Sequence, residues 1–184
     1  PFDVEAKVSD NYLKVGNQNV RLLSGGKPSE IPWDMMDLDV VIDSTGVTWP
    51  KEEVKAYRDH TKRTMITNPE VTSVDRIVVP GVNESEISQD DKIVSPSSST
   101  TQVLALMLKI LDQEFDVRNA MMATVHAYTS DQPLADNTQV RRRRSRSAVE
   151  NIIPNETPSP RLVEALFPHL KGKVKGVAFN VPVP

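Results

Sequence analysis

The stretch Leu38-Asp39-Val40-Val41-Ile42-Asp43-Ser44-Thr45-Gly46 decides the fold class. Its apolar run over 38–43 is typical of a buried strand in a parallel sheet, and Ser44–Gly46 predicts a tight turn directly after it. Pro50, followed by Lys51-Glu52-Glu53, predicts a helix start, because proline suits the first helical turn and acids favour its positive end. A strand, a turn and a helix in this order predict an α/β fold.

Short strand-like segments flank this unit on both sides. Before it, Phe2–Val8, Tyr12–Val15 and Val20–Leu23 are separated by polar turn residues, which predicts a hairpin or meander. After it, Thr64–Thr67 and Arg76–Val79 each stop near a proline and predict further strands. The parallel sheet is therefore expected to contain several short strands.

The second half of the chain also alternates between strand and helix signals. A short strand, Lys92–Val94, leads into a serine-rich run, and apolar residues then recur at helical spacing, which predicts a helix from Thr100 to Glu114. The remaining expected elements are a strand over Asn119–Tyr128, a polar loop over Thr129–Ser147, a helix near Pro160–Phe167 and a strand over Val174–Val181.

Composition excludes several classes of protein. The 184 residues can bury the core of one domain or of two small ones. The chain has no cysteine, which excludes disulfides, thiolate metal sites and a cysteine nucleophile, and favours a cytosolic location. The formal net charge of −3 argues against nucleic acid as the default partner. We recognise neither a signal peptide nor a transmembrane segment, and both ends look cut rather than finished.

The most informative candidate site is the expected helix entry at Ser98-Ser99-Thr100. A helix N-terminus presents free backbone N–H groups and a positive dipole end, which suit an anion or a developing oxyanion. The same residues also fit a structural role, because Ser99-Thr100-Thr101-Gln102 matches a capping box. Both interpretations remain open from the residues alone.

His126, at the end of an expected strand, is a candidate proton acceptor. A single histidine is also commonly a structural residue. Ser99 with His126 suggests a serine-type pair, but no third residue is identified that would orient the imidazole, and no G-x-S-x-G motif occurs. No G-x-G-x-x-G motif, Walker A loop or metal-spaced cluster of His, Asp and Glu occurs either.

A basic run, Arg141-Arg142-Arg143-Arg144-Ser145-Arg146, lies in the expected polar loop. It could bind phosphates or nucleic acid, pair with acids across a subunit interface, or form a solvated loop. No aromatic residues interleave with the arginines, which makes nucleic acid an unlikely ligand.

Taken together, the motifs resemble the glyceraldehyde-3-phosphate dehydrogenase family, which includes erythrose-4-phosphate dehydrogenase-like members. The matching segments are Trp33, Asp39–Gly46 (DVVIDSTG), Thr67-Asn68-Pro69, Val79–Asn83 (VPGVN), Ile93–Gln102 (IVSPSSSTTQ), Thr124–Thr129 (TVHAYT), Asp131-Gln132, Arg143–Arg146 (RRSR), Asn151–Pro154 (NIIP) and Leu170–Pro184 (LKGKVKGVAFNVPVP). The resemblance implies part of a Rossmann-type NAD-binding domain over 1–97, followed by part of an α+β catalytic domain over 98–184. The glycine-rich loop of the family would precede Pro1.

The resemblance also implies roles for individual residues. Ser99 stands where the family has its nucleophilic cysteine, and His126 matches the catalytic histidine. The cofactor, NAD or NADP, would contact Ser44, Thr45, Gly46 and Thr67. A small phosphorylated aldehyde and inorganic phosphate would be bound by Ser98, Thr100, Thr129, Arg144, Thr157 and Asn180. The family further implies a cytoplasmic homotetramer in which the arginine loop serves the subunit interface or the cofactor phosphate.

The sequence departs from the family pattern at the reaction centre. A thiol ionises near neutral pH far more readily than the Ser99 hydroxyl, so this replacement removes the central chemical step. Asn180 replaces a phosphate-binding arginine, Pro158 replaces a glycine and so removes a backbone N–H donor, and Gln102 replaces an asparagine. Three functions therefore remain: an oxidoreductase with degenerate activity, a non-catalytic paralogue with a binding or assembly role, and Ser/His hydrolase-like chemistry.

Overall fold

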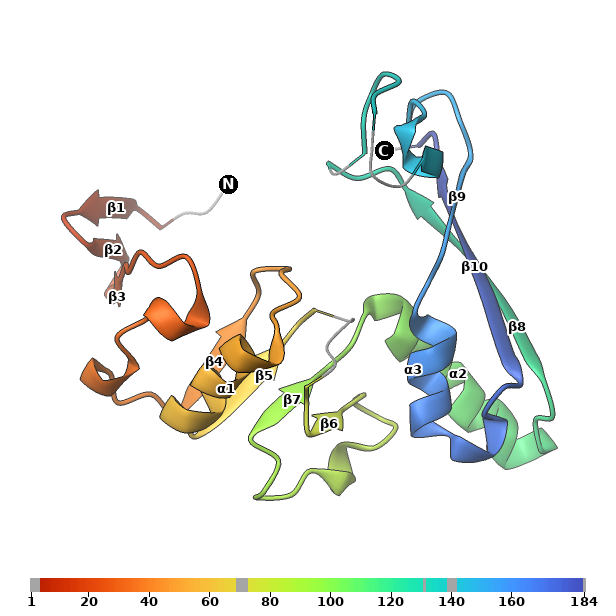
Figure 1. Cartoon of the computed structure of the whole chain (residues 1–184), viewed down its shortest axis with the longest axis horizontal. Coiled ribbons are helices and arrows are strands. Elements are labelled where there is room, and N and C mark those ends of the chain that lie inside the picture. The colour runs from red at the N-terminus through yellow and green to blue at the C-terminus, as the bar shows by residue number, and fades with distance from the viewer. Residues whose placement is uncertain (1–3, 69–72, 131, 139–141, 184) are drawn as a thin grey trace.

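A computed structural model describes residues 4–68, 73–130, 132–138 and 142–183 (Figure 1). The predicted strand over 2–8 therefore begins outside the described residues, and parts of four quoted motifs, at positions 69, 131, 141 and 184, also lie outside them. The described residues form three sheets, with helices α2 and α3 lying between the parallel sheet of the first half and the strands of the second half. The expected α/β class is confirmed.

The first sheet is the expected meander. Strands β1 (Ala6–Ser9), β2 (Tyr12–Val15) and β3 (Gln18–Arg21) pair antiparallel in the order β1-β2-β3. Gly16 forms the second turn with a φ of 56°, a left-handed conformation that glycine adopts without steric cost. Most of its side chains are exposed, so this sheet adds little to the core.

The second sheet is parallel, as predicted. Its strands are β4 (Val40–Asp43), β5 (Arg63–Ile66), β6 (Arg76–Ile77) and β7 (Ile93–Ser95), in the order β4-β5-β7-β6. The prediction that 38–43 is buried is wrong. Among the described strands, β4 pairs with β5 alone and lies at the edge of the sheet, and Val40 and Ile42 are 54% and 63% exposed. An apolar run alone does not distinguish an edge strand from a central one.

Helix α1 (Lys51–His60) crosses from β4 to β5. It starts after Pro50 as expected, and Val54 and Tyr57 on one of its faces pack with Trp33, Ile66 and Ile93. The rings of Trp33 and Tyr57 meet edge to face at 5.7 Å between centroids. This cluster is the core of the first half.

The third sheet and two helices form the second half. Helices α2 (Ser99–Phe115) and α3 (Ser159–Leu166) pack together, and α3 also packs on β10 (Val174–Val181). β10 is the central strand: it pairs parallel with β8 (Ala120–Ala127) and antiparallel with β9 (Ile153–Asn155). The register places Asn180 of β10 opposite His126 of β8.

Sequence patterns missed β9 and the short 3₁₀ helices. The latter are η1 (Pro28–Glu30), η2 (Trp33–Met35), η3 (Glu84–Glu86), η4 (Arg142–Ser145) and η5 (Pro168–Leu170). Each is four residues or shorter, which is too short to produce a hydrophobic period.

The hydrophobic core of the second half also includes a residue of the first half. It contains Leu104, Ala105 and Leu108 of α2 with Val163, Leu170 and Val174, and also the fully buried Val79, which precedes α2. Lys109 of α2 donates a hydrogen bond to the Gly81 carbonyl at 2.6 Å. The helices of the second half are therefore anchored on the segment that follows β6.

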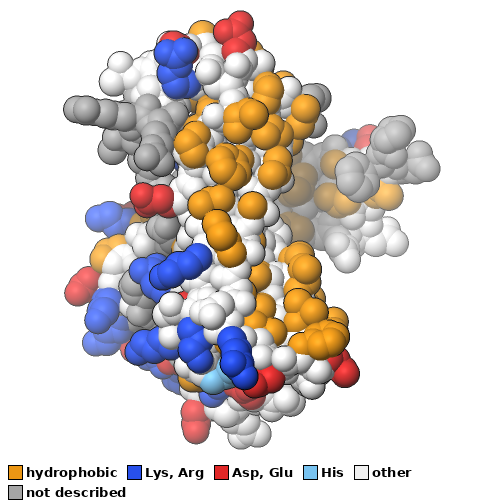
Figure 2. Space-filling model, turned by 90° about the vertical axis from the view of Figure 1, so that its right-hand side faces the viewer, with side chains coloured by type: hydrophobic (Ala, Val, Ile, Leu, Met, Phe, Trp, Pro, Cys, Tyr) orange, Lys and Arg blue, Asp and Glu red, His pale blue; other side chains and the backbone are white. Residues whose placement is uncertain are grey.

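One face of the second half is apolar. Figure 2 shows hydrophobic side chains along the side of the molecule that lies at the right of Figure 1. Exposed apolar residues of this half include Met107 and Ile110 of α2 and Met121 and Val125 of β8. Such a face is typical of a surface that packs against further protein. Among the described residues, no helix is long and apolar enough to cross a membrane.

Candidate functional site

The turn after β4 is fixed by one buried carboxylate. Oδ1 of Asp43 accepts hydrogen bonds from the backbone N–H of Thr45 at 3.0 Å and from its hydroxyl at 2.7 Å. Oδ2 accepts from the Trp49 indole and the Tyr57 hydroxyl, both at 2.9 Å. Burial and the bond to Asp43 raise the pKa of Tyr57, so its hydroxyl remains a proton donor.

The neighbouring strand closes this turn from the other side. The backbone N–H and the hydroxyl of Thr67, directly after β5, both donate to the Asp43 carbonyl, at 2.9 and 3.0 Å. The Asn68 amide donates to the Gly46 carbonyl at 3.1 Å. The residues predicted to contact the cofactor, Ser44–Gly46 and Thr67, thus gather at the carboxyl edge of the parallel sheet. Ligands of open α/β sheets bind at this edge.

The turn after β7 is fixed by hydroxyls. Ser98 is the N-cap of α2, and its Oγ accepts from the Thr101 N–H at 3.1 Å. The predicted capping box, which began at Ser99, is therefore wrong by one residue. The Gln102 amide donates instead to the Pro96 carbonyl at 2.9 Å. Ser99 is the first helical residue, it is exposed, and its side chain has no part in the cap.

A chain of hydroxyls joins the starts of α2 and α3. Ser98 Oγ and Thr101 Oγ1 lie 2.8 Å apart, and Thr101 Oγ1 donates to Ser159 Oγ at 3.0 Å. The Thr157 hydroxyl donates to Ser159 Oγ at 3.1 Å. Thr101 and Ser159 are buried, so these hydrogen bonds hold the two helix starts beside each other.

His126 and Asn180 lie side by side at the ends of their strands. His126 Nε2 is 2.9 Å from the Thr124 hydroxyl, so that nitrogen already has a partner. The Asn180 amide donates to the Ala127 carbonyl at 3.2 Å, and its oxygen accepts a short hydrogen bond from the Asn155 amide. Two neutral amides therefore occupy the floor beside the histidine.

These elements enclose a cavity of about 310 Å³. It brings together His126 and every residue predicted to bind substrate or phosphate. Its lining is Ser98, Thr100, His126, Thr129, Arg144, Asn155, Glu156, Thr157, Pro158, Ser159, Ala178 and Asn180. The sequence motifs did not point to Asn155, Glu156 or Ser159 as site residues. Their position between the NIIP motif and the next helix was the available signal.

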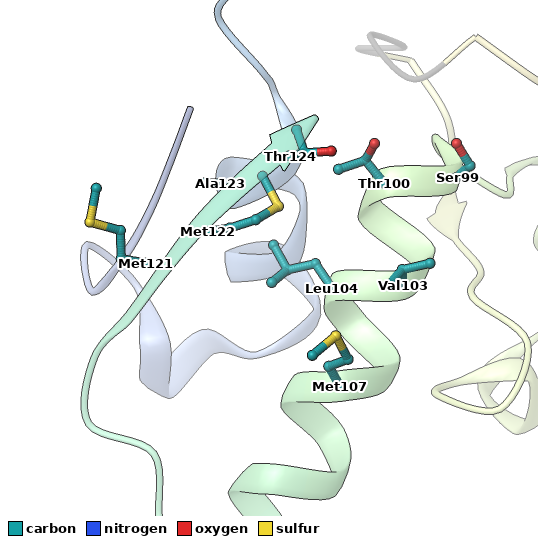
Figure 3. Close-up of a pocket in the computed structure, with 9 residues that line it drawn as sticks. All are labelled: Ser99, Thr100, Val103, Leu104, Met107, Met121, Met122, Ala123 and Thr124. Carbon is teal, nitrogen blue, oxygen red and sulfur yellow. The ribbon is translucent and has the colours of Figure 1, made fainter. Parts of the chain in front are cut away.

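Ser99 lines a different cavity. That cavity measures about 460 Å³ and lies between α2 and β8 (Figure 3). Three methionines, 107, 121 and 122, line it, so most of its surface is apolar. In Figure 3 Thr124 points toward Thr100, which lies nearer to β8 than Ser99 does. No hydrogen bond joins Ser99 to His126, both of which lie in the described part of the chain, so the suggested Ser/His pair is not formed.

Of the basic run, Arg144 lines the smaller cavity, and Arg146 forms an ion pair with Asp136 at 3.3 Å. Arg141 lies outside the described residues. Among the described residues, no group of three or more His, Asp or Glu could hold a metal ion.

Comparison with known proteins supports the resemblance seen in the sequence motifs. A sequence profile described as "Glyceraldehyde 3-phosphate dehydrogenase, C-terminal domain" matches residues 98–184. The chloroplastic glyceraldehyde-3-phosphate dehydrogenase A of Zea mays is 38% identical over 185 residues, covering all of this chain and 46% of that protein. Glyceraldehyde-3-phosphate dehydrogenase 2 of Bacillus subtilis is 36% identical over all of this chain and 54% of its own length. The chain is similar to glyceraldehyde-3-phosphate dehydrogenases over its whole length.

The chain spans about half the length of the curated relatives that it matches. The Mycobacterium avium glyceraldehyde-3-phosphate dehydrogenase, for example, is 36% identical over all of this chain and 54% of that protein. The carboxyl edge of the parallel sheet and the cavity beside His126 are two places where the described residues gather polar groups. At the edge, Thr45 is exposed and its hydroxyl donates to Asp43, and the sequence contains no glycine-rich phosphate loop.

Proposed function

We propose that this chain is the central part of an NAD(P)-dependent, glyceraldehyde-3-phosphate dehydrogenase-like oxidoreductase whose activity is degenerate. The observation that carries the proposal is Ser99, a hydroxyl at the first residue of α2, where the family resemblance expects a thiol. The proposal keeps the division into a cofactor part over 1–97 and a catalytic part over 98–184. A cytoplasmic location and a homotetramer remain predictions from the family.

The chemistry explains why a hydroxyl weakens this site. The nucleophile must add to the aldehyde carbon while its proton passes to a base. The family resemblance assigns that base to His126, which lines a different cavity from Ser99 in this structure. A helix N-terminus lowers the pKa of a thiol enough to form thiolate at neutral pH. A serine hydroxyl is much less acidic, so the same position yields very little alkoxide. When bound, NAD(P) supplies the hydride acceptor of the family's reaction.

Two further replacements support a general loss of activity rather than an exchange of the nucleophile alone. Pro158 and Asn180 both line the cavity, and neither offers the donor that the family pattern has there. The hydrolase alternative receives no support, because among the described residues no hydrogen bond joins Ser99 to His126 and no carboxylate is bonded to the imidazole. A non-catalytic paralogue with a binding role differs from the proposal only in having no residual turnover.

Ser99→Cys tests the proposal, because it creates the one thiol of a cysteine-free chain. The rate of alkylation by iodoacetamide, followed against pH, reports the pKa of that thiol. We expect a pKa about one unit or more below that of Ser24→Cys, an exposed loop position used as a matched control. Glyceraldehyde should protect the thiol at position 99 by forming a hemithioacetal, and should leave the control thiol unprotected.

Equal thiol pKa values in the two variants would show that position 99 is not an activated nucleophile site. A second readout addresses degeneracy. With NAD and phosphate added, Ser99→Cys should give only slow NADH formation, because Pro158 and Asn180 remain. Fast, sustained turnover from this one change would contradict a degenerate site, and no NADH formation at all would favour the non-catalytic paralogue.

A further inference from the structure

The cavity beside His126 carries a nearly balanced charge. Among its lining residues, Arg144 brings a positive charge and Glu156 a negative one. The other polar lining side chains are His126 and neutral hydroxyls and amides: Ser98, Thr100, Thr129, Asn155, Thr157, Ser159 and Asn180. Hydroxyls and amides both donate and accept, so they match the hydroxyl groups of a ligand well. A phosphate dianion needs an excess of donors and positive charge, which the described lining residues lack.

The start of α3 has few donors to offer an anion. A helix N-terminus binds anions through free backbone N–H groups. Here Pro158 and Pro160 have no N–H, and the Ser159 N–H donates to the Thr157 hydroxyl at 3.3 Å. The Leu162 N–H donates to the Pro158 carbonyl at 3.1 Å. The first turn of α3 therefore has only the Arg161 N–H left over.

The hydrogen-bonded side chains of Asn155 and Asn180 are a further uncharged part of the cavity lining. Asn180 stands at the end of β10 with its oxygen bonded to the Asn155 amide and its nitrogen bonded to the Ala127 carbonyl. These two contacts hold a neutral side chain where a cation would be needed to neutralise a phosphate group. Glu156 lies next to Asn155 in the chain and adds a carboxylate to the same rim.

We propose that this cavity selects an unphosphorylated polyhydroxy aldehyde over its phosphate ester. The inference rests on the proposed function for the presence of an aldehyde site, and it changes the substrate class. The hydroxyls of the ligand bond to the serine, threonine and asparagine side chains, while Glu156 and the missing α3 donors disfavour a phosphate.

The test compares three probes on the full chain: D-glyceraldehyde, glyceraldehyde 3-phosphate and inorganic phosphate. The side-chain amide signals of Asn155 and Asn180, followed by ¹⁵N NMR during titration, report binding inside the cavity. We expect glyceraldehyde to shift these signals, and the phosphate ester to bind at least about fivefold more weakly. Tighter binding of the ester or of phosphate would overturn the proposal, as would the absence of any shift with glyceraldehyde.

Two substitutions sharpen the test. Glu156→Gln at the exposed rim should narrow the preference for glyceraldehyde, because it removes the carboxylate without changing the shape. Asn180→Arg should reverse the preference toward the phosphate ester, whereas Asn180→Gln, which stays neutral, should not. An unchanged preference in both Glu156→Gln and Asn180→Arg would contradict the charge argument.

Failure of this inference can be distinguished from failure of the proposed function. Activation of a thiol at position 99 is read by alkylation, while ligand choice is read at the two amides. A selective cavity without thiol activation would refute the oxidoreductase origin and leave a binding site for polyhydroxy compounds. An activated thiol with preference for the phosphate ester would refute only this inference.

Discussion

The two strand-to-helix turns of the parallel sheet are held in place by different side-chain groups. After β4, the turn is held by the Asp43 carboxylate, which accepts four hydrogen bonds. After β7, the turn is held by the Ser98 hydroxyl, which accepts from the Thr101 N–H. The Asp43 carboxylate that anchors the first turn can only accept hydrogen bonds. The second leaves the N–H groups of Ser99 and Thr100 at the helix start. The turn after β4 is thus held more rigidly, whereas the turn after β7 keeps backbone N–H groups available for a ligand.

The largest effect is expected from Asp43→Asn. An amide accepts through its oxygen alone, so the NH₂ group would face donors of Trp49 and Tyr57 or of Thr45. Leaving buried donors without an acceptor should lower the free energy of unfolding by about 2 kcal/mol or more. Urea denaturation followed by tryptophan fluorescence measures the loss, since Trp49 reports the same cluster.

The matched control is Asp39→Asn, just before β4. The Asp39 side chain is 86% exposed and pairs with Lys62, so its replacement should cause no measurable loss. Similar losses in the two variants would contradict the anchoring role of Asp43.

Ser98→Ala tests the hydroxyl anchor and should have a smaller effect. Loss of a serine N-cap removes the acceptor for the Thr101 N–H and should reduce stability by about 1 kcal/mol. Ser99→Ala is the control, and it should change stability by less than about 0.5 kcal/mol, because Ser99 is exposed and takes no part in the cap. The same urea titration measures both. A greater loss of stability in Ser99→Ala than in Ser98→Ala would show that Ser99 is the N-cap.

The smallest effect concerns a carboxylate at the opposite end of β7. Asp91 accepts from Arg76 Nε at 2.7 Å and from the Ser88 N–H at 2.8 Å, and these bonds lower its pKa below the ordinary value of 3.8. A lowered pKa in the folded chain stabilises it above pH 3.8, and this stabilisation is lost as the pH falls through the folded value.

Comparison of wild type with Asp91→Asn from pH 7 to pH 2.5 measures this effect. The stability difference between them should be constant above about pH 5 and should shrink below pH 4. A difference that persists at pH 2.5 would show that the carboxylate acts through packing alone.

Strong local signals predicted the fold well. The strand Val174–Val181 was predicted with its observed bounds, because apolar and β-branched residues fill it. β9 was missed because it is three residues long and contains Pro154, which is tolerated only at a sheet edge. The cap was misplaced because Ser97, Ser98 and Ser99 are equivalent candidates from sequence. The exposure of β4 depends on which strands pair, which the residues of β4 do not encode.

The site could be predicted only in part. The motif resemblance supplied the residues from Ser98 to Asn180 that the cavity brings together. The pairing of His126 with Asn180 follows from strand register, and the amide pair follows from β9, so neither was visible in the sequence. The separation of Ser99 from His126 depends on the direction of the first turn of α2.

Val79 carries a consequence for how the chain unfolds. Its side chain precedes the predicted domain border at residue 97, yet it is buried among residues of α2 and of the segments after it. Lys109 binds the carbonyl of Gly81 in the same segment. Because α2 cannot leave its place without exposing Val79, loss of the second half also strips the segment after β6 of its packing partners. The segment after β6 and the α2–α3 layer are therefore coupled in stability, across the predicted domain border.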